Sequence, residues 1–228
     1  MATSHSTTPS STTPEAYQSA FSLPIPQPSL KHSFRLCCDL EAVRSVGEGL
    51  AGDGGQFNWI NFTGGHFEGS WGSGEIVAGG QDSQHLLPAH HPSAPLAAQL
   101  STRYLLKTSD GVFIQVQTRG WRTGPKEALE RLSAAAREGF EGKVPEASEY
   151  KFRLQIEMET DSKNPEYAWL NTAMFVGSGL RSGRQGTVCF PFFFFLGLLF
   201  AHANNLHMGT DLQSPGIRTV IYDAYLIE

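Results

Sequence analysis

The stretch TRYLLKTSDGVFIQVQT, residues 102–118, carries the strongest structural signal in the chain. Two runs rich in apolar side chains flank the pair Asp110-Gly111. An Asp-Gly pair between two such runs is typical of a tight β-hairpin turn. The stretch therefore predicts two antiparallel strands, over residues 102–108 and 112–118.

The strand pattern continues on both sides of this hairpin. Residues 150–160 alternate strictly between apolar and polar side chains, as expected of a strand with one buried face. One helix is predicted from Pro125 to about Gly139, because Leu129 and Leu132 recur at helical spacing and glycine can end a helix. Further strands are predicted at residues 29–36, 57–62, 66–69, 75–78, 169–176 and 219–227, with a loop at 84–98.

About eight to ten short strands with one short helix indicate an all-β, mainly antiparallel fold. A single β-barrel, lipocalin-like in outline, is favoured over a sandwich because closure removes exposed sheet edges. We expect the barrel domain to span residues 30–228. Residues 1–29 are rich in Ser, Thr and Pro, and they are predicted to form a disordered N-terminal tail.

The composition of the 228 residues limits the class of partner. The formal net charge is −5 and no basic patch stands out, which argues against nucleic acid or an anionic membrane surface. The three cysteines, Cys37, Cys38 and Cys189, show no disulfide or zinc spacing. The first residues contain no apolar stretch of the secretory type. We therefore expect a reducing, cytoplasmic location.

Neither a metal nor an organic cofactor is expected. His85, His90 and His91 lie in the predicted loop, but no third ligand follows at a fixed spacing. The chain contains no nucleophile elbow, P-loop or dinucleotide-binding pattern in a strand-to-helix context. The expected partner is a small organic ligand, and self-association into a homo-oligomer is left open.

Residues 188–215 interrupt the strand pattern with an intensely apolar segment. Its apolar run is shorter than the ~20 residues that a transmembrane helix needs. Val188-Cys189 can be encoded by GTATGT, a common fungal intron donor, and the Phe/Leu run is what a pyrimidine-rich stretch translates to. Two interpretations remain open: a translated, unspliced intron, or a genuine insertion that covers the barrel mouth or contacts a second subunit. Transcript sequencing separates them, because a message that uniformly retains the segment excludes the intron.

Six short motifs follow one another in an order and spacing that resemble a known family. They are GGHFEG (64–69), GGQD (79–82), YLLKTSDG (104–111), ET (159–160), YAWLN (167–171) and VIYDAY (220–225). Together they resemble the domain-of-unknown-function family 3237, also called uncharacterised protein family 0311. The lead-in at residues 55–63 looks like its fungal branch. The resemblance implies a β-barrel with no assigned biochemical role, and a link to secondary-metabolite or aromatic-compound genes.

Four motif side chains are candidates for acid–base catalysis. His66 and Glu68 are two residues apart in a strand and therefore share a face. If that face is the lumen, His66 moves a proton and Glu68 orients it. Asp82 and Glu159 are candidate lumen carboxylates, with Glu159 a general base of raised pKa. The alternatives are rim or solvent positions for His66, Glu68 and Glu159, and a turn-capping role for Asp82.

Four more side chains are candidates for ligand contacts. Trp169 and Asn171 share one face of a predicted strand, where the indole would stack on a flat ligand and the amide would bond its oxygen. Tyr104 and Tyr225 would supply walls and hydroxyl donors. Core packing, with the polar atoms bonded to backbone groups, is the alternative reading of these positions.

These residues lead to one expectation and one alternative. The expectation is a small-molecule-binding barrel that catalyses a cofactor-free isomerisation, cyclisation or dehydration of a polyketide or aromatic metabolite, since such steps need only acid–base groups and positioning. The alternative is a non-catalytic ligand-binding, structural or oligomeric barrel. The enzyme reading requires the acidic, amide and indole side chains of separate strands to converge on one interior space.

Overall fold

The structure is a computed structural model that describes residues 4–5, 12, 14–48, 54–87, 96–136, 143–182 and 219–228. Its strands are β1 (Ser4–His5), β2 (Ile25–Pro26), β3 (Leu30–Leu40), β4 (Arg44–Glu48), β5 (Gln56–Gly69), β6 (Gly72–Leu87), β7 (Leu96–Thr108), β8 (Phe113–Gly124), β9 (Lys151–Glu159), β10 (Phe175–Ser182) and β11 (Thr219–Ile227). Its helices are α1 (Glu15–Phe21), α2 (Lys126–Ala135), α3 (Pro165–Ala168) and the short 3₁₀ helix η1 (Trp169–Thr172).

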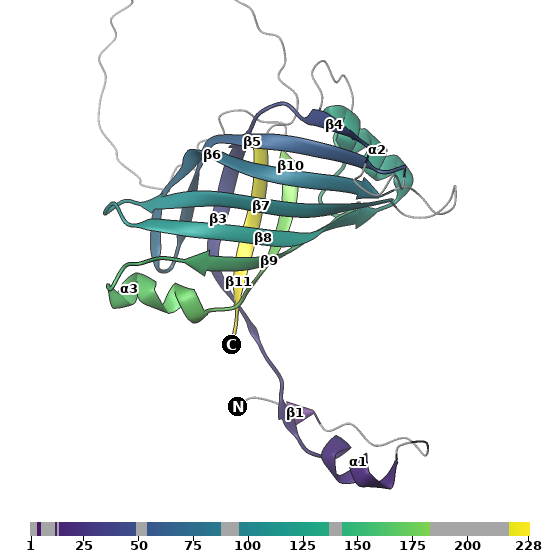
Figure 1. The fold of residues 1–228 in the computed structure, drawn as a ribbon, viewed down its shortest axis with the longest axis vertical. Coiled ribbons are helices and arrows are strands. Elements are labelled where there is room, and N and C mark those ends of the chain that lie inside the picture. Colours follow the sequence, from purple (N-terminus) through teal and green to yellow (C-terminus); the bar gives the residue numbers. More distant parts are fainter. Residues whose placement is uncertain are drawn as a thin grey trace, which may run out of the picture.

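The main sheet closes on itself. Its strand order is β3-β11-β10-β9-β8-β7-β6-β5-β4, and an additional pairing of β3 with β5 joins the two sides (Figure 1). Every neighbouring pair is antiparallel, and β5 to β11 follow the chain as a simple meander. The result is a closed eight-stranded barrel with β4 as one extra strand. The predicted all-β, antiparallel barrel is confirmed.

Alternation along the strands builds the barrel interior. Strand β9 buries every second residue, and its inward side chains are Phe152, Leu154, Ile156 and Met158. The hairpin of β7 and β8 turns at residues 109–112, as the Asp-Gly pair predicts. Each strand has one apolar face, so burying that face inside the barrel removes it from water and stabilises the closed sheet.

Glycines let β5 and β6 bend where the barrel closes. The pairing of β5 with β6 shifts register between Asn61 and His66. Within that shift Gly65 has a positive φ of 140°, and a Cβ there would lie 2.2 Å from the Cys37 carbonyl oxygen. Such bulges increase the local bend of a strand. The Gly64-Gly65 pair of the first sequence motif therefore serves barrel geometry.

Helix α2 lies at one end of the barrel, and the helices α3 and η1 lie at the other (Figure 1). Helix α2 follows β8 and packs Leu129 and Leu132 into the hydrophobic core at one end. Helix α3 and η1 lie at the other end, where Tyr167 contacts Trp71 with ring centroids 6.4 Å apart. None of the helices within the described ranges is long and apolar enough to cross a bilayer.

Three sequence predictions differ from the structure. Residues 57–62 and 66–69 were expected to be two strands, but they form the single strand β5. Residues 169–176 were expected to be one strand, but Trp169–Thr172 is helical and the strand begins at Phe175. The cause is a helix that starts at Asn164. The Asn164 side chain accepts a hydrogen bond from the Glu166 N–H at 3.1 Å, and a proline follows at the first helical position. The expected loop at 84–98 is shorter, because β6 continues to Leu87 and β7 begins at Leu96.

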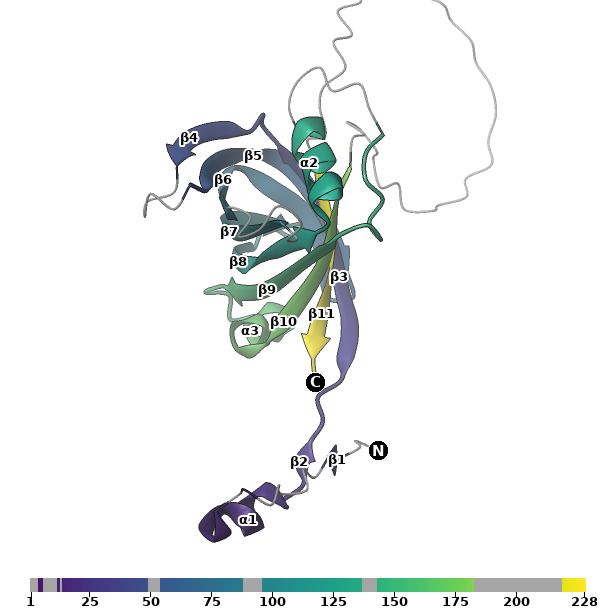
Figure 2. The ribbon, with the colours of Figure 1, turned by 90° about the vertical axis from the view of Figure 1, so that its right-hand side faces the viewer.

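Several other predictions fall partly or wholly outside the described residues. The segment 188–215, His90, His91 and Cys189 are among them. Strands β10 and β11 nevertheless pair from Phe175 opposite Leu226 to Ser182 opposite Thr219, so the two strand ends that flank this segment lie side by side. In the N-terminal region, β1, α1 and β2 lie away from the barrel (Figure 2). Disorder of the 1–29 tail stays a prediction.

Candidate functional site

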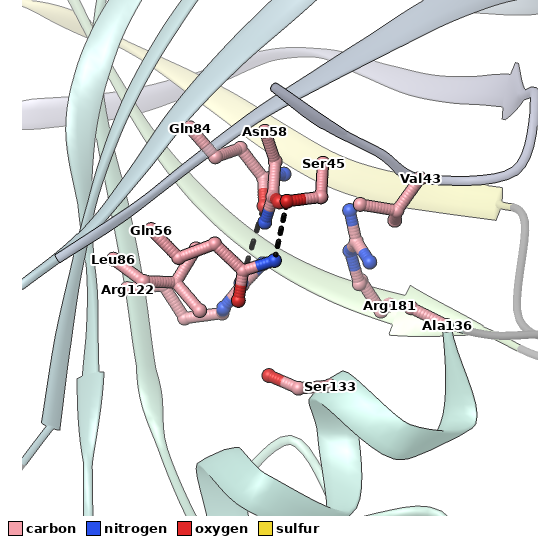
Figure 3. A pocket seen from close by; sticks show the side chains of 10 residues that line it. All are labelled: Val43, Ser45, Gln56, Asn58, Gln84, Leu86, Arg122, Ser133, Ala136 and Arg181. Atoms are coloured by element: carbon pink, nitrogen blue, oxygen red, sulfur yellow. Dashed lines mark hydrogen bonds between the residues drawn. The ribbon is translucent and has the colours of Figure 1, made fainter. Parts of the chain in front are cut away.

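The barrel interior contains a cavity at the α2 end, which we call the mouth cavity. Its volume is about 210 Å³. It is lined by Val43, Ser45, Gln56, Asn58, Gln84, Leu86, Arg122, Ser133, Ala136 and Arg181, which come from the barrel strands, β4 and helix α2 (Figure 3). Seven of these ten side chains are polar, so the wall is more polar than that of a typical small-molecule site, which is mostly apolar.

Two buried arginines are the most unusual feature of the mouth cavity. Arg122 on β8 is 4% exposed and Arg181 on β10 is 5% exposed. Arg122 Nη2 donates a long hydrogen bond of 3.5 Å to Gln84 Oε1. Arg122 Nη1 and Arg181 Nε and Nη2 are buried without a hydrogen-bond partner among the described residues. Arginine is rarely buried unless it is paired, so these donors indicate a missing acceptor.

Asp82 lies deeper in the lumen, next to the mouth cavity. Gln84 Nε2 donates to Asp82 Oδ2 at 2.6 Å, while Asp82 Oδ1 is buried without a partner among the described groups. Burial raises the pKa of Asp82, and the Gln84 hydrogen bond and the positive charges of Arg181 and Arg122 oppose that rise. The pKa of Arg122 is lowered to about 9, mainly by burial and secondly by the positive charge of the nearby Arg181. Arg122 therefore stays cationic at neutral pH.

The charges inside the barrel do not balance. Among the described residues, the buried members of the Asp, Glu, Lys and Arg class are Asp82, Arg122 and Arg181. Two positive charges and one negative charge leave a formal charge of +1 in the lumen. An uncompensated buried charge is costly, so an anion placed beside the two arginines would offset part of that cost.

Below the mouth cavity is a second, much smaller space, which we call the deep compartment. Its volume is about 30 Å³, roughly the share of one water molecule in the liquid. Asp82, Cys38, Tyr104 and Tyr222 line it together with apolar side chains and the threonine pair Thr102–Thr118. The hydroxyls of Tyr104 and Tyr222 are hydrogen-bonded to each other. Burial raises the pKa of both tyrosines and of the Cys38 thiol, so all three stay protonated at neutral pH.

The structure separates the four candidate catalytic residues. Asp82 faces the lumen as expected, whereas His66, Glu68 and Glu159 are exposed on the outer face of the barrel. The expected convergence of these four side chains is therefore wrong. The reason is the two-residue alternation: Phe67 takes the inward position between His66 and Glu68, and Met158 takes it beside Glu159. Glu159 Oε2 instead accepts a hydrogen bond from Gln115 Nε2 at 3.1 Å.

The four candidate ligand-binding residues are also divided. Tyr104 lies inside the barrel, in the deep compartment. Asn171 is exposed, and its side chain bonds both the N–H and the carbonyl of Thr160, at 2.8 and 3.0 Å. Trp169 donates to the Glu166 carbonyl at 3.0 Å and packs beside Phe175. Tyr225 packs edge-on against His32, outside the lumen.

Sequence reasoning missed Arg122, Arg181, Gln84 and Asn58, which are the buried polar residues of the mouth cavity. A signal for Arg122 was present, because it continues the inward series of β8 by the same two-residue step as Ile114, Val116 and Thr118. Within the described ranges, no group of three His, Cys, Asp or Glu side chains could hold a metal ion.

Sequence comparisons place the chain among bacterial proteins without an assigned function. The family profile described as "Protein of unknown function (DUF3237)" matches residues 28–193. A UPF0311 protein of Rhodopseudomonas palustris strain TIE-1 is 29% identical over 151 residues, which are 66% of this chain and 87% of that protein. A UPF0311 protein of Clostridium acetobutylicum is 31% identical over 104 residues, 46% of this chain and 56% of that protein. These relatives are bacterial, so the resemblance to a fungal branch is not confirmed.

Solved structures agree with the fold. A conserved protein of unknown function from Rhodopseudomonas palustris aligns with a TM-score of 0.63 and 24% identity, over 90% of this chain and 100% of that one. A protein from Acinetobacter baumannii AYE, described as β-barrel like, aligns with a TM-score of 0.57 and 30% identity, over 90% of this chain and 98% of that one. With a family match over most of its length and the same barrel, the chain belongs to the DUF3237 family of proteins of unknown function.

Proposed function

We propose that this chain binds a small organic anion in the mouth cavity, with Arg122 and Arg181 as its charge partners. The observation that carries the proposal is that both guanidinium groups are buried, line one cavity and have N–H donors without a partner among the described residues. A buried donor without a partner costs free energy, which a ligand acceptor offsets. A carboxylate matches the planar fork of arginine donors, often with two parallel hydrogen bonds.

The size and lining of the cavity narrow the ligand further. About 210 Å³ is small for a ligand site, so the ligand is a compact molecule. Val43, Leu86 and Ala136 form an apolar part of the wall beside the arginines. The excess of one positive charge matches a monoanion better than a dianion. A monocarboxylate with an aliphatic or aromatic body fits these three requirements.

Asp82 supports a catalytic extension of this proposal. Its Oδ1 accepts no hydrogen bond from any described residue, and its pKa is raised, which suits a group that accepts a proton from a bound ligand, while the arginines stabilise negative charge that develops on the ligand oxygen. The extended proposal is a cofactor-free isomerisation, cyclisation or dehydration of an aromatic or polyketide acid. One observation favours the alternative of a binding protein without chemistry: Asp82 lines the deep compartment and not the mouth cavity itself.

Calorimetric titration at pH 7 with acetate, benzoate and 3-phenylpropanoate tests the binding proposal. We expect at least one of the three to bind, and Arg181→Met to weaken its binding at least tenfold, about 1.4 kcal/mol. The matched control is Arg119→Met on the outer face of β8, which should leave binding unchanged. Absence of binding by all three acids, or an equal loss in the control, would disprove the proposal.

The catalytic extension needs a separate measurement. Deuterium exchange of the protons next to the carbonyl of 4-oxopentanoate, followed by NMR in heavy water, detects proton abstraction whatever the natural substrate is. Catalysis by Asp82 requires faster exchange with the wild type than in buffer, and loss of that acceleration in Asp82→Asn. Binding without acceleration would leave the non-catalytic alternative.

A further inference from the structure

The mouth cavity and the deep compartment are arranged end to end along the lumen. Asp82, which lines the deep compartment, is hydrogen-bonded to Gln84, which lines the mouth cavity. On the opposite wall, Arg181 of β10 pairs with Val220 of β11, and Tyr222 is two residues farther along β11. Two residues of a strand span about 7 Å. A small molecule whose carboxylate is bound by Arg181 therefore has to extend by about this distance along the lumen to reach Tyr222.

The tyrosine pair holds one proton more than its mutual hydrogen bond uses. Tyr104 and Tyr222 each carry a hydroxyl with one proton, and one of these protons forms the bond between them. The hydroxyl that accepts this bond still has its own proton to donate. Both side chains are buried, at 3% and 4% exposure, so the acceptor for this proton has to lie inside the lumen.

Asp82 is the carboxylate among the residues that line the deep compartment, but its Oδ1 has no hydrogen-bond partner among the described residues, so neither tyrosine donates its proton to it. Seven of the thirteen lining residues of the compartment are hydrocarbon side chains, namely Leu36, Leu40, Phe62, Leu100, Phe152, Leu154 and Val220. The two threonine hydroxyls bond each other at 2.6 Å. The space of about 30 Å³ accommodates one group of the size of an oxygen atom or a methyl. In such apolar surroundings an oxygen gains a hydrogen bond from the tyrosine pair, whereas a methyl leaves the proton unpaired.

We infer that the ligand is an organic acid with a second oxygen function, a carbonyl or a hydroxyl, that accepts a hydrogen bond from the Tyr104–Tyr222 pair. The inference rests on the proposed function, because the arginines fix the carboxylate end. It adds a specificity site at the other end of the ligand. Oxo acids and phenolic acids should therefore bind with higher affinity than acids of equal shape that carry a methyl group in place of the oxygen.

Two isosteric ligand pairs test this selectivity. The first pair is 3-(4-hydroxyphenyl)propanoate and 3-(4-methylphenyl)propanoate, and the second is 4-oxopentanoate and 4-methylpentanoate. With the wild-type protein, we expect the oxygen-containing member of at least one pair to bind about tenfold more tightly. A site built to donate to a ligand oxygen discriminates at least this strongly when the oxygen is missing.

The decisive variant is Tyr104→Phe combined with Tyr222→Phe, because a single substitution leaves one hydroxyl that can still donate. In the double variant the preference should vanish, while the affinity of the methyl ligands stays within about twofold. If the double variant does not fold, carbonyl-labelled 4-oxopentanoate bound to the wild type provides the test by infrared spectroscopy. Its carbonyl stretch should move to lower frequency than in a non-donating solvent.

The outcomes separate the two proposals. Equal affinity within both pairs, a preference that survives in the double variant, or an unshifted carbonyl stretch overturns the tyrosine site and leaves the arginine site standing. Failure of all four acids to bind the wild type overturns the arginine site, and the tyrosine site with it. Loss of both methyl and oxygen ligands in the double variant also overturns the inference, because the tyrosines would then support the cavity and not the ligand oxygen.

Discussion

The two ends of the barrel differ in the side chains that point inward. At the end near α3 and η1, which we call the closed end, β3 and β5 carry Phe34 and Phe67. At the α2 end, which we call the mouth, β8 and β10 carry Arg122 and Arg181. The aromatic end is packed: Phe67 stacks on Trp71 with centroids 5.4 Å apart, and Phe34 meets Trp71 edge-on at 5.5 Å. The mouth contains a cavity, and some of its arginine N–H groups have no hydrogen-bond partner within the described parts of the chain.

This difference assigns separate tasks to the two ends. Burial of aromatic rings at the closed end removes apolar surface from water and stabilises the fold. Burial of two guanidinium groups at the mouth costs free energy unless an anion pairs with them. A feature that costs stability is expected where a protein has a function to perform. The following substitutions test this division, beginning with the largest expected effect.

Phe67→Ala removes a ring from the closed end. Phe67 is 1% exposed and stacks on Trp71, so the variant loses buried area and leaves a cavity. We expect the free energy of unfolding to fall by about 3–5 kcal/mol, measured by urea denaturation. The control is Phe113→Ala, since Phe113 is 52% exposed at the hairpin and should change stability by less than about 0.5 kcal/mol. A small loss for Phe67→Ala would mean that the closed end is not the stabilising end.

Arg122→Met removes a charge from the mouth and should act in the opposite direction. The lowered pKa of Arg122 means that folding disfavours its charged form, which is the form present at pH 7. Methionine fills a similar volume, and Asp82 then faces Arg181 alone, with no net charge. We expect the free energy of unfolding to rise by about 1–3 kcal/mol and the melting temperature by about 2–4 °C per kcal/mol, measured without ligand.

The same variant should bind carboxylates more weakly. Higher stability combined with lower affinity is the result that separates a ligand-binding arginine from a structural one. Arg119→Met, an exposed position on the same strand, is the control and should change neither property. A destabilised Arg122→Met protein would instead show that the Gln84 contact of Arg122 supports the fold.

The barrel could be predicted from the sequence because its signals are local. The Asp-Gly turn and the alternation of residues 150–160 each involve neighbours in the chain, and both correspond to elements of the structure. The Asn164-Pro165 helix start was an equally local signal that was overlooked. The register between strands is non-local, because it depends on which strands meet after closure.

The candidate site could be predicted only in part for the same reason. Alternation shows that His66 and Glu68 share a face, but not that Phe67 takes the inside. Asp82 was a candidate lumen carboxylate with a turn cap as the alternative, and it faces the lumen, as does Tyr104, a candidate ligand contact. Arg122 and Arg181 are far apart in the chain. They come close together because only β9 lies between their strands, β8 and β10, in the sheet. No motif of the sequence contains both.

His66→Ala, Glu68→Gln and Glu159→Gln should have the smallest effect. His66 and Glu68 are the exposed neighbours of the buried Phe67 on β5. The loss of unfolding free energy on substitution should therefore differ by several kcal/mol between Phe67 and these two neighbours. We expect each change to alter the free energy of unfolding by less than about 0.5 kcal/mol, since surface substitutions away from buried networks are nearly neutral. Carboxylate affinity and deuterium exchange of 4-oxopentanoate should also stay at wild-type values. Loss of exchange in any of the three, with stability unchanged, would move the site of chemistry from the lumen to the outer face and restore the catalytic role that the sequence motifs first indicated.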